Sequence, residues 1–600
     1  MHKYDIRRPL TAAEQSELSA YPPFLAHLLF HRGLAGAEAA GRFLGPDYDA
    51  HIHDPFLLKD AEKAADRIIN AVKSGEKIAI YADYDADGIP GAAIWNDFFG
   101  RIGFKDFVVY IPHRHDEGFG LNEEAVEELA GQGVKLIVTV DCGIADIGPV
   151  EKANELNMDV IITDHHEPPV SPDTGLESLP PALAVIDHKR GDCPYPDKSL
   201  CGSGVAFKLI QAILKKERFG LKEGHEKWLL DLVGLATLSD MVSLTGENRV
   251  FAYYGMQVLR KTPRKGLRKL FDRLRMRQSQ LTEDDMAFMV TPRINAASRM
   301  GVPMDAFDLL AADNDDDAAR FAERLDAVNN ERKGVVASLV KEVKKKVRER
   351  FRIHDSGFKN KNETADGLPS VIVLGNPEWR PSLLGLAANS CAEEFDRPVF
   401  LWGRDGGNVI KGSCRSEGRT HVVELMRAAS AGSFMQFGGH KHSGGFAVEN
   451  DAVHYLEQRL NEAAQKIQDS GFKIQEDGKV ETYTDSVDAE LKLEDVDWKM
   501  FNDVNRLAPF GVGNPKPVFL FRNVVPVQVK KFGKGSEHIE LVFKKSDGSK
   551  VSAISFFGAD NEAVSTAQPG EPLDLIASLE KSTFRSTPEL RLRVVDVVTS

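Results

Sequence analysis

The segment KIAIYADYDADGIPGAA, residues 77–93, gives the clearest indication of how this chain folds. Its segment DYDADG, residues 83–88, begins like the loop of a calcium-binding helix–loop–helix motif, with oxygen ligands at alternate positions followed by a glycine. Such a loop needs a bidentate Glu at its twelfth position, where this chain has Ile94, and it follows a helix. The run at 78–82 is instead apolar and typical of a buried strand. The sequence therefore predicts three carboxylates at the end of a strand and not a calcium loop.

The composition indicates a multidomain protein of ordinary globular character. With 600 residues the chain is too long for one hydrophobic core, so we expect about three or four domains. No apolar run reaches the roughly 18 residues of a membrane span, and the N-terminus does not resemble a signal peptide. The five cysteines are scattered and odd in number, which favours a reducing compartment, so we expect a cytoplasmic protein without membrane association. The net charge of −14 does not exclude a local basic groove for nucleic acid.

Residues 59–190 alternate between short apolar runs and amphipathic stretches. The apolar runs predict strands at 77–83, 107–112, 135–141, 159–163 and 183–187. The amphipathic stretches predict helices near 60–74, 91–101, 122–132 and 147–156. This alternation is typical of a parallel sheet covered by helices, so the fold class that we expect is α/β.

The rest of the chain divides into further parts. Residues 1–55 form a lead-in of mixed polarity, and 200–275 are mostly helical. Apolar residues recur at helical spacing from about 313 to 351, which predicts one long helix whose acidic start and basic end suit the helix dipole. A second α/β unit runs from about 370 to 465, and strand-like runs after 475 predict a small barrel of about five strands.

Two further apolar strands end in acidic residues or histidines. Asp141 closes the run LIVTV, and the series DHH at 164–166 closes the run VIIT. Because the carboxyl ends of parallel strands lie at one edge of a sheet, these side chains can converge with the carboxylates of residues 83–88. Asp240, at the end of the helical run GLATLS, is a further candidate.

The clustered carboxylates predict a metal site, because a bound cation removes their mutual repulsion and the cost of desolvating them. Aspartates with an imidazole suit manganese, or magnesium with more retained water, better than structural zinc. A single Asp at a strand end is ordinarily a helix cap or turn residue, but three such strands favour a metal centre. Two divalent ions about 3.5–4 Å apart are a standard device for phosphoester hydrolysis. In that device Asp141 would bridge the ions, and His166 would orient the phosphate or donate a proton.

Several motifs resemble those of a known family. DYDADG, DCGI, TDHH and SD occur in the order of the four metal motifs of the DHH phosphoesterase superfamily. IPHRHDEGFGLN, TPRINAASRMG, KGSCRS, FGGHKHSGGFAV and LAPFGVGNPKPVF are similar to motifs of the RecJ family of single-strand-specific 5′→3′ exonucleases of recombination and repair. The resemblance implies a lead-in at 1–55, a DHH catalytic domain at 56–310, a connecting helix at 311–352, a DHH-associated substrate-binding domain at 353–470 and an OB-fold nucleic-acid-binding domain at 471–600.

The resemblance also implies the residues of the site. The ligands of two manganese or magnesium ions would be Asp83, Asp85, Asp87, Asp141, His165 and Asp240. Asp164 would orient the end of its strand. The residues implied in substrate binding are Arg114, Ser203, Arg299, Ser413, Arg415, Gly439 and His440.

Three of these residues have a plain structural alternative. Arg114 can form a surface ion pair with Asp116 or Glu117. Arg299 can form a salt bridge, and the glycine-rich turn around Ser203 can serve close packing alone.

The expected function is that of a metal-dependent exonuclease that degrades single-stranded DNA from a 5′ end and releases mononucleotides. The barrel would bind a long strand through its lysines and the rings of Phe532 and Phe556, unless these rings belong to the barrel core. The alternatives are a DHH hydrolase for short oligoribonucleotides or cyclic dinucleotides, and a non-catalytic replication or repair scaffold. As partners we expect single-stranded DNA, a RecQ-type helicase and a single-strand-binding protein, and we expect a monomer. Arg380 stands where RecJ proteins usually have a histidine and receives no role.

Overall fold

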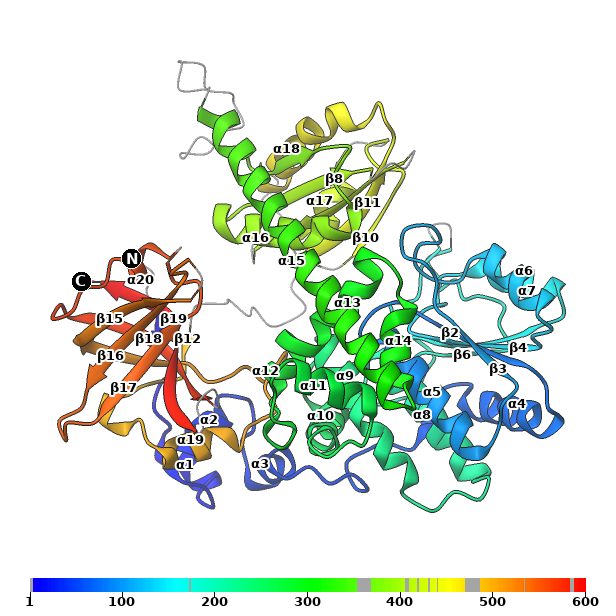
Figure 1. The fold of residues 1–600 in the computed structure, drawn as a ribbon, viewed down its shortest axis with the longest axis horizontal. Coiled ribbons are helices and arrows are strands. Elements are labelled where there is room, and N and C mark those ends of the chain that lie inside the picture. Colours follow the sequence, from blue (N-terminus) through cyan, green and yellow to red (C-terminus); the bar gives the residue numbers. More distant parts are fainter. Residues whose placement is uncertain are drawn as a thin grey trace.

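The computed structural model describes residues 4–171, 174–352, 368–404, 409–417, 420–429, 432–439, 441–469, 486–533, 535–559, 561–582 and 588–599. Figure 1 shows a helix-covered sheet at the right, a second α/β unit at the top and a β-rich unit at the left. The predicted domain boundary at 352–353 falls where the described residues stop, and the one at 470–471 lies outside the described residues. Among the helices of the described ranges, none offers the apolar length that a bilayer crossing requires.

The first sheet has five strands, all parallel, in the order β3-β2-β4-β5-β6. Its strands are β2 (Ile78–Ala82), β3 (Phe107–Tyr110), β4 (Leu136–Val140), β5 (Asp159–Thr163) and β6 (Ala184–Ile186). Ile80 and Val138 belong to one hydrophobic core, whereas Tyr81 and Ile137 belong to another, because side chains alternate across a strand. Three helices that contribute to the first core are α4 (Ala61–Ser74), α5 (Gly88–Ile102) and α8 (Gly202–Lys216). Two helices contribute to the second core, α6 (Glu123–Gly131) and α7 (Ile147–Glu155). The sheet is therefore covered on both faces, as the alternating pattern predicts.

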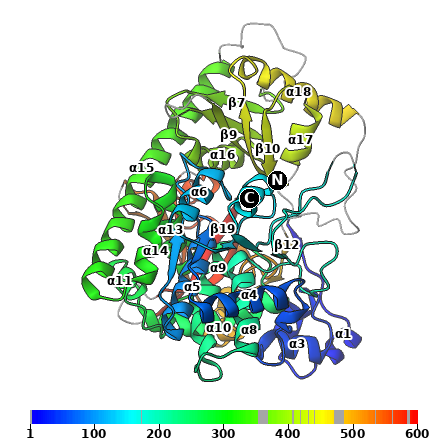
Figure 2. The same cartoon turned by 90° about the vertical axis from the view of Figure 1, so that its right-hand side faces the viewer.

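A helical layer follows the sheet. It consists of α9 (Leu230–Ser239), α10 (Gly246–Leu259), α11 (Lys265–Arg273), α12 (Glu283–Asp285), α13 (Thr291–Met300) and α14 (Met304–Ala311). The predicted long helix is present as α15 (Asp315–Arg352), whose 38 residues span about 57 Å at roughly 1.5 Å per residue. It packs on α11, α13 and α14 at its start and on α16 (Pro381–Phe395) further along, so it joins the first α/β unit to the second (Figure 2).

The second sheet is mixed, in the order β10-β11-β9-β8-β7. Its strands are β7 (Ile372–Gly375), β8 (Val399–Gly403), β9 (Ile410–Arg415), β10 (Gln436–Gly439) and β11 (Ser443–Val448). Only the β7–β8 pair of these is parallel. The helices α17 (Val422–Ala428) and α18 (Val453–Asp469) share a core with one face of this sheet, and α16 packs on β8 and β9.

The C-terminal unit has seven described strands in one sheet, in the order β13-β14-β18-β19-β17-β16-β15, rather than the roughly five that the sequence pattern predicts. They are β13 (Ala489–Glu490), β14 (Phe519–Val524), β15 (Pro526–Phe532), β16 (His538–Lys544), β17 (Lys550–Ser555), β18 (Leu573–Ser582) and β19 (Glu589–Thr599), accompanied by α19 (Trp498–Asn505) and α20 (Glu562–Ser565).

The N-terminal residues are part of the same unit, which the sequence pattern did not reveal. The helices α1 (Ala12–Glu17), α2 (Pro23–Phe30) and α3 (Ala37–Leu44) precede the first sheet, and β1 (Asp5–Ile6) pairs with β12 (Ser486–Val487). Leu25, Leu29 and Phe43 share one core with Phe519 and Phe521 of β14. The segment predicted as a lead-in therefore packs against the C-terminal unit.

Candidate metal centre and substrate cleft

Three neighbouring strands of the first sheet deliver acidic residues to one edge. Asp83 follows β2, Asp141 follows β4 and Asp164 follows β5. Their backbone N–H groups donate to carbonyl oxygens at the end of the adjacent strand, at 3.0–3.1 Å, so the ladder continues past the strand ends. The three carboxylates are therefore held side by side at the carboxyl edge of the parallel sheet.

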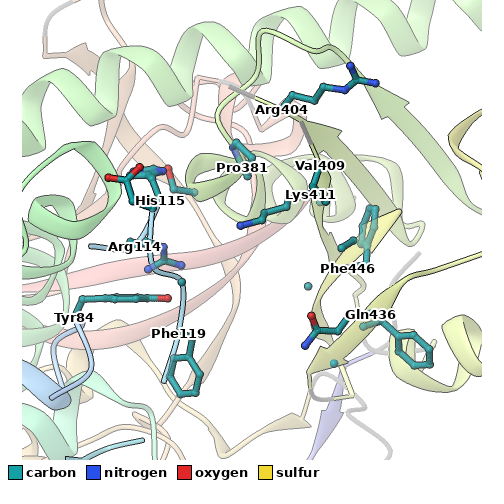
Figure 3. A pocket seen from close by; sticks show the side chains of 18 residues that line it. Tyr84, Arg114, His115, Phe119, Pro381, Arg404, Val409, Lys411, Gln436 and Phe446 are labelled. Carbon is teal, nitrogen blue, oxygen red and sulfur yellow. The ribbon is translucent and has the colours of Figure 1, made fainter. Parts of the chain in front are cut away.

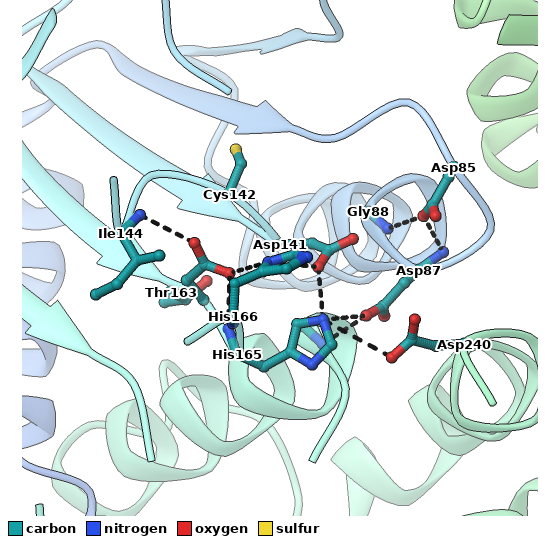
Figure 4. A network of polar contacts seen from close by, with 12 residues as sticks. Asp85, Asp87, Gly88, Asp141, Cys142, Ile144, Thr163, His165, His166 and Asp240 are labelled. Carbon is teal, nitrogen blue, oxygen red and sulfur yellow. Dashed lines mark hydrogen bonds and ion pairs between the residues drawn. The ribbon is translucent and has the colours of Figure 1, made fainter. Parts of the chain in front are cut away.

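His165 lies at the centre of the cluster (Figure 4). Its Nε2 is 3.0 Å from Asp141 Oδ1. The same atom is 3.7 Å from Asp240 Oδ2 and 3.8 Å from Asp87 Oδ2. Two ligands bonded at about 2.1 Å to one octahedral ion lie about 3 Å apart, so the separation of His165 and Asp141 fits a shared cation. Asp240 reaches the cluster because the buried helix α9 ends at this edge.

The potential ligand atoms form three groups in which all atoms lie within 4.8 Å of one another: Asp141, His165 and His166; Asp87, His165 and Asp240; and Asp83, Asp85 and Asp141. Asp83 Oδ1 and Asp240 Oδ2 are buried and accept no hydrogen bond from the residues that the structure describes. Burial and the neighbouring carboxylates raise the pKa of Asp83, Asp141 and Asp240. A divalent cation would satisfy these oxygens, and carboxylate with imidazole donors fits manganese or magnesium.

Asp164 orients the two histidines. Its Oδ1 accepts a hydrogen bond from the His165 N–H at 2.7 Å and lies 2.7 Å from His166 Nδ1, while its Oδ2 accepts from the Ile144 N–H at 2.9 Å. Burial opposes both charged forms, yet the hydrogen bond between the two side chains lowers the pKa of Asp164 to about 2 and raises that of His166 to about 9. These bonds use both oxygens of Asp164, so this residue holds the two histidines in position.

Ser203 is placed differently from the expectation that its turn meets substrate phosphate. Its N–H donates to Asp87 Oδ1 at 2.8 Å and its hydroxyl donates to the Asp87 carbonyl oxygen at 2.5 Å. The Gly202 N–H donates to Asp87 Oδ2 at 2.5 Å. Ser203 is fully buried. The start of α8 thus binds an anion, as a helix N-terminus favours, but this anion is the carboxylate of Asp87. The prediction that Ser203 contacts substrate is therefore wrong, because Ser203 instead holds Asp87 in position.

Arg114 does not form the surface ion pair considered as its alternative. Asp116 pairs with His113 at 2.6 Å, and Glu117 accepts hydrogen bonds from Tyr110 and the His113 N–H. The Arg114 guanidinium instead lies over the ring of Tyr84, 4.7 Å from its centroid, and lines the cleft described below. This position leaves Arg114 available to an anionic ligand.

Arg299 joins the two α/β units. Its Nη1 donates to the Ser382 carbonyl oxygen at 2.9 Å, and the Ser382 hydroxyl donates back to the Arg299 carbonyl oxygen at 2.9 Å. Burial and the positive charges of Arg114 and Arg332 lower the pKa of Arg299 to about 9. Within the described ranges no ion pair neutralises Arg299, so its guanidinium charge is available to an anionic ligand.

On the second sheet, Ser413 and Arg415 occupy alternate positions of β9 and therefore share one face with Lys411. A Cβ at Gly385 of α16 would lie 2.8 Å from Arg415 Nη2, so the absence of a side chain there gives room for the guanidinium. Gly439 has φ +141°, and a Cβ at this position would lie 2.3 Å from the Ser443 carbonyl oxygen. His440, also predicted to bind substrate, lies outside the described residues.

A cleft of about 940 Å³ separates the two α/β units (Figure 3). Tyr84, Arg114 and Phe119 line one wall. Lys411 and Gln436 belong to the other wall, with Arg404, Phe437 and Phe446. The sequence reasoning missed Lys411 and Phe119, although both lie within quoted motifs; strand alternation counted back from Ser413 would have found Lys411. The Phe119 ring lies 5.5 Å from that of His166, which links the cleft to the metal cluster.

The parallel sheet with its clustered aspartates and histidines is that of a DHH-type phosphoesterase. Three protein-family models match parts of this chain: the DHH family N-terminal domain at residues 77–237, the DHHA1 domain at 368–470 and the RecJ OB domain at 487–596. The chain belongs to the RecJ family of exonucleases, as the following relatives show.

The sequence is 32% identical over 607 residues to "Single-stranded-DNA-specific exonuclease RecJ" of Bacillus subtilis (strain 168), covering 100% of this chain and 71% of that protein. It is 32% identical over 464 residues to the protein of the same name from Escherichia coli (strain K12), covering 75% of this chain and 76% of that protein. The fold matches the crystal structure of RecJ in complex with Mn²⁺ from Thermus thermophilus with a TM-score of 0.76 and 26% identity, covering 100% of this chain and 80% of that one.

Proposed function

We propose that this chain is a metal-dependent exonuclease for single-stranded DNA that works from the 5′ end and releases mononucleotides. The observation that carries the proposal is the convergence of the acidic strand ends with His165 and Asp240 beside a cleft with cationic walls. The names of the relatives describe exonucleases specific for single-stranded DNA, which supports this choice of substrate. A RecQ-type helicase and a single-strand-binding protein as partners, a monomeric state and a cytoplasmic location stay predictions.

The donor set fits two manganese or magnesium ions, with Asp141 shared between the ligand groups. Bound ions of this kind supply Lewis acidity and a water of lowered pKa for attack on phosphorus. His165, Asp87 and Asp240 would form one end of the centre, and Asp83 and Asp85 the other. Asp164 holds the two histidines in place, and His166, half-exposed beside Asp141, would contact the phosphate.

The preference for a 5′ end would arise on the cationic walls of the cleft. We assign a terminal phosphate to Arg114, which lines the cleft, and to Ser413 and Arg415, which lie on β9 on the same face as the cleft residue Lys411. A terminal phosphate carries more charge than an internal phosphodiester, and guanidinium groups can bind its oxygens in a bidentate manner. Lys411, on the same face of β9, would contact the next phosphate of the strand.

Replacing Arg415 by alanine should raise KM for a 5′-phosphorylated strand about 10-fold and reduce the preference over a 5′-hydroxyl strand, because a charge-assisted hydrogen bond is lost. Steady-state kinetics on the two substrates measure this change. Arg427→Ala is the matched control, since Arg427 is exposed on α17 and pairs only with Glu424 among the described residues. Loss of bound manganese in Arg415→Ala would contradict the assignment.

The OB domain presents a basic and aromatic surface. Phe532 and Phe557 are exposed and Phe556 is half-buried, and all three rings lie 5.0–5.2 Å from the ring of His538. Arg593 lies over Phe556 at 4.1 Å. Phe532 and Phe556 are therefore outside the barrel core, and stacking on the bases of a single strand is the use that we assign to them.

The double variant Lys530→Glu/Lys531→Glu should weaken binding of a long single strand and lower the slope of log affinity against log salt by about 1.4, at about 0.7 per phosphate contact. Both lysines are exposed on β15. Lys63→Glu/Lys105→Glu, exposed on the first α/β unit, is the charge-matched control. We prefer these variants to deletion of the domain, because deletion would expose the core shared with α2 and α3. An unchanged slope would place the strand elsewhere.

The alternative of a hydrolase for short substrates is tested by comparing turnover of a dinucleotide with that of a long single strand. A 940 Å³ cleft and a separate OB domain favour the long strand. Equal or faster turnover of the dinucleotide would favour the alternative.

A further inference from the structure

A second cavity, of about 300 Å³, lies where the N-terminal helices, the first α/β unit and the segment before β14 meet. It shares no lining residue with the substrate cleft. Three guanidinium groups line it, from Arg32, Arg42 and Arg249. Leu34, Phe43 and Val250 add apolar surface. The cavity therefore combines concentrated positive charge with an apolar wall.

Arg249 is buried without an acidic partner. It is 3% exposed, and its guanidinium stacks on the ring of Phe43, with Cζ 3.4 Å from the ring centroid. Its Nε donates to the Phe43 carbonyl oxygen at 2.6 Å, and its Nη2 donates to the carbonyl oxygens of Leu507 and Ala508 at 3.1 and 3.2 Å. Its Nη1 is buried and has no hydrogen-bond partner among the described residues. The hydrogen-bond partners of Arg249 among the described residues are neutral, and Glu283 acts on its charge without forming an ion pair in the described structure, so the buried cation is only partly compensated.

The carboxylate that lines this cavity and the one that pairs with Arg32 are already engaged. Glu247 lines it, but its Oε1 pairs with Lys208 Nζ at 2.8 Å and its Oε2 accepts from the Tyr195 hydroxyl at 2.5 Å. Asp488 lies 4.0 Å from Arg32 and is shared with Arg7, at 3.5 Å. Arg42 is exposed and has no ion pair with a described residue. The cavity thus keeps a surplus of positive charge that an external anion would balance.

We propose that this cavity binds a phosphate monoester dianion and has room for an attached nucleoside. Guanidinium groups match the oxygens of a phosphate, and several positive charges favour a dianion. Arg42 offers a guanidinium fork and Arg249 its Nη1, whereas Arg32, whose three nitrogens donate to Leu28, Asn514 and Pro515, adds charge alone. The volume lies at the lower limit of small-molecule sites, which are mostly apolar with a few polar groups that fix orientation. Leu34, Phe43 and Val250 supply the apolar part.

Occupancy of the site would also tighten a junction of the fold. Arg249 of α10 bonds to α3 through Phe43 and to the segment before the OB strands through Leu507 and Ala508. An anion that neutralises this cluster lowers the cost of keeping Arg249 buried, so it stabilises the contact between the OB unit and the first α/β unit. This inference does not depend on the nuclease reaction.

The test is a calorimetric titration of the full chain carrying Arg415→Ala, which removes one arginine of the proposed terminal-phosphate site. The probes are inorganic phosphate, deoxyadenosine 5′-monophosphate and deoxyadenosine. We expect inorganic phosphate and deoxyadenosine 5′-monophosphate to bind at the cavity lined by Arg42, besides weakened binding at the terminal-phosphate site, and deoxyadenosine not to bind. If the monophosphate binds more tightly than inorganic phosphate, the site is assigned to nucleotides. If the two bind equally, the site is assigned to free phosphate. Either result supports the proposal.

Adding Arg42→Ala should weaken phosphate binding at least about 10-fold, whereas Glu38→Ala on the same helix should not weaken it. Arg42 carries the test because Arg249 also holds three segments together, so that its loss endangers folding. In the chain with Arg415 intact, Arg42→Ala should leave nuclease activity unchanged. Phosphate binding that is absent, or that does not respond to Arg42→Ala, would overturn the proposal, as would binding of deoxyadenosine with the affinity of its monophosphate.

Discussion

Replacing Asp141 by alanine should reduce cleavage of single-stranded DNA by at least about 10³-fold. Asp141 belongs to two of the three ligand groups, and its Oδ1 lies 3.0 Å from His165 Nε2. Alanine removes both carboxylate oxygens, so the two groups of potential metal ligands lose the residue that they share. Release of labelled nucleotides from a single strand under single-turnover conditions, with saturating manganese, measures the effect.

The backbone at Asp141 requires a second variant, because its φ of +62° lies in the left-handed region, which few side chains tolerate. Asparagine tolerates this region and keeps the size of the side chain, so Asp141→Asn isolates the loss of charge, and we expect it to cost at least about 10²-fold. Asp159→Asn is the control, since Asp159 begins β5 at the opposite end of the sheet and pairs with Arg67. Cleavage by Asp141→Asn at the wild-type rate would contradict the assignment.

Replacing Gly202 by alanine should reduce cleavage about 10²-fold and weaken manganese binding. A Cβ at residue 202 would lie 2.5 Å from Asp141 Cβ and 2.8 Å from Asp141 Cα, so either α8 or the end of β4 must move. The Gly202 N–H also holds Asp87, so the shift would reach both carboxylates. A displacement of about 1 Å in a catalytic site can cost about 10²-fold in rate. Rate measurements combined with manganese titration report both effects.

Gly204→Ala on the same helix is the matched control. A Cβ at residue 204 would have its nearest neighbour, Cys201 Sγ, at 3.6 Å, which is an ordinary contact. We expect this variant to cleave within about threefold of the wild-type rate. Equal losses in the two variants would mean that the helix tolerates no alanine at all, and that the close approach to Asp141 is not the cause.

The metal centre was predictable because it depends on strand ends. The apolar runs before Asp83, Asp141 and the residues 164–166 each indicate a buried strand, and parallel pairing then brings their carboxyl ends to one edge. Asp240 was predictable for a related reason, since a carboxylate directly after a buried helical run needs a partner.

Other features depend on contacts between distant parts of the chain, which local patterns do not encode. A helix that starts with small residues binds a phosphate or a carboxylate equally well. Ser203 holds a carboxylate because the fold places Asp87 beside it, although Asp87 lies 116 residues earlier in the chain. Leu25 and Leu29 indicate a helix with an apolar side, but not that Phe519 and Phe521 cover it. The cavity around Arg249 likewise joins segments from three regions of the chain.

Anomalous diffraction at the manganese edge, from crystals of the full chain grown with Mn²⁺, tests the central claim most directly. The account predicts two peaks about 3.5–4 Å apart. Asp141 should contact both ions, His165 Nε2 should bind one of them, and the remaining ligands should be Asp83, Asp85, Asp87 and Asp240. Peaks away from Asp141 and His165, or none at this edge of the sheet, would contradict it.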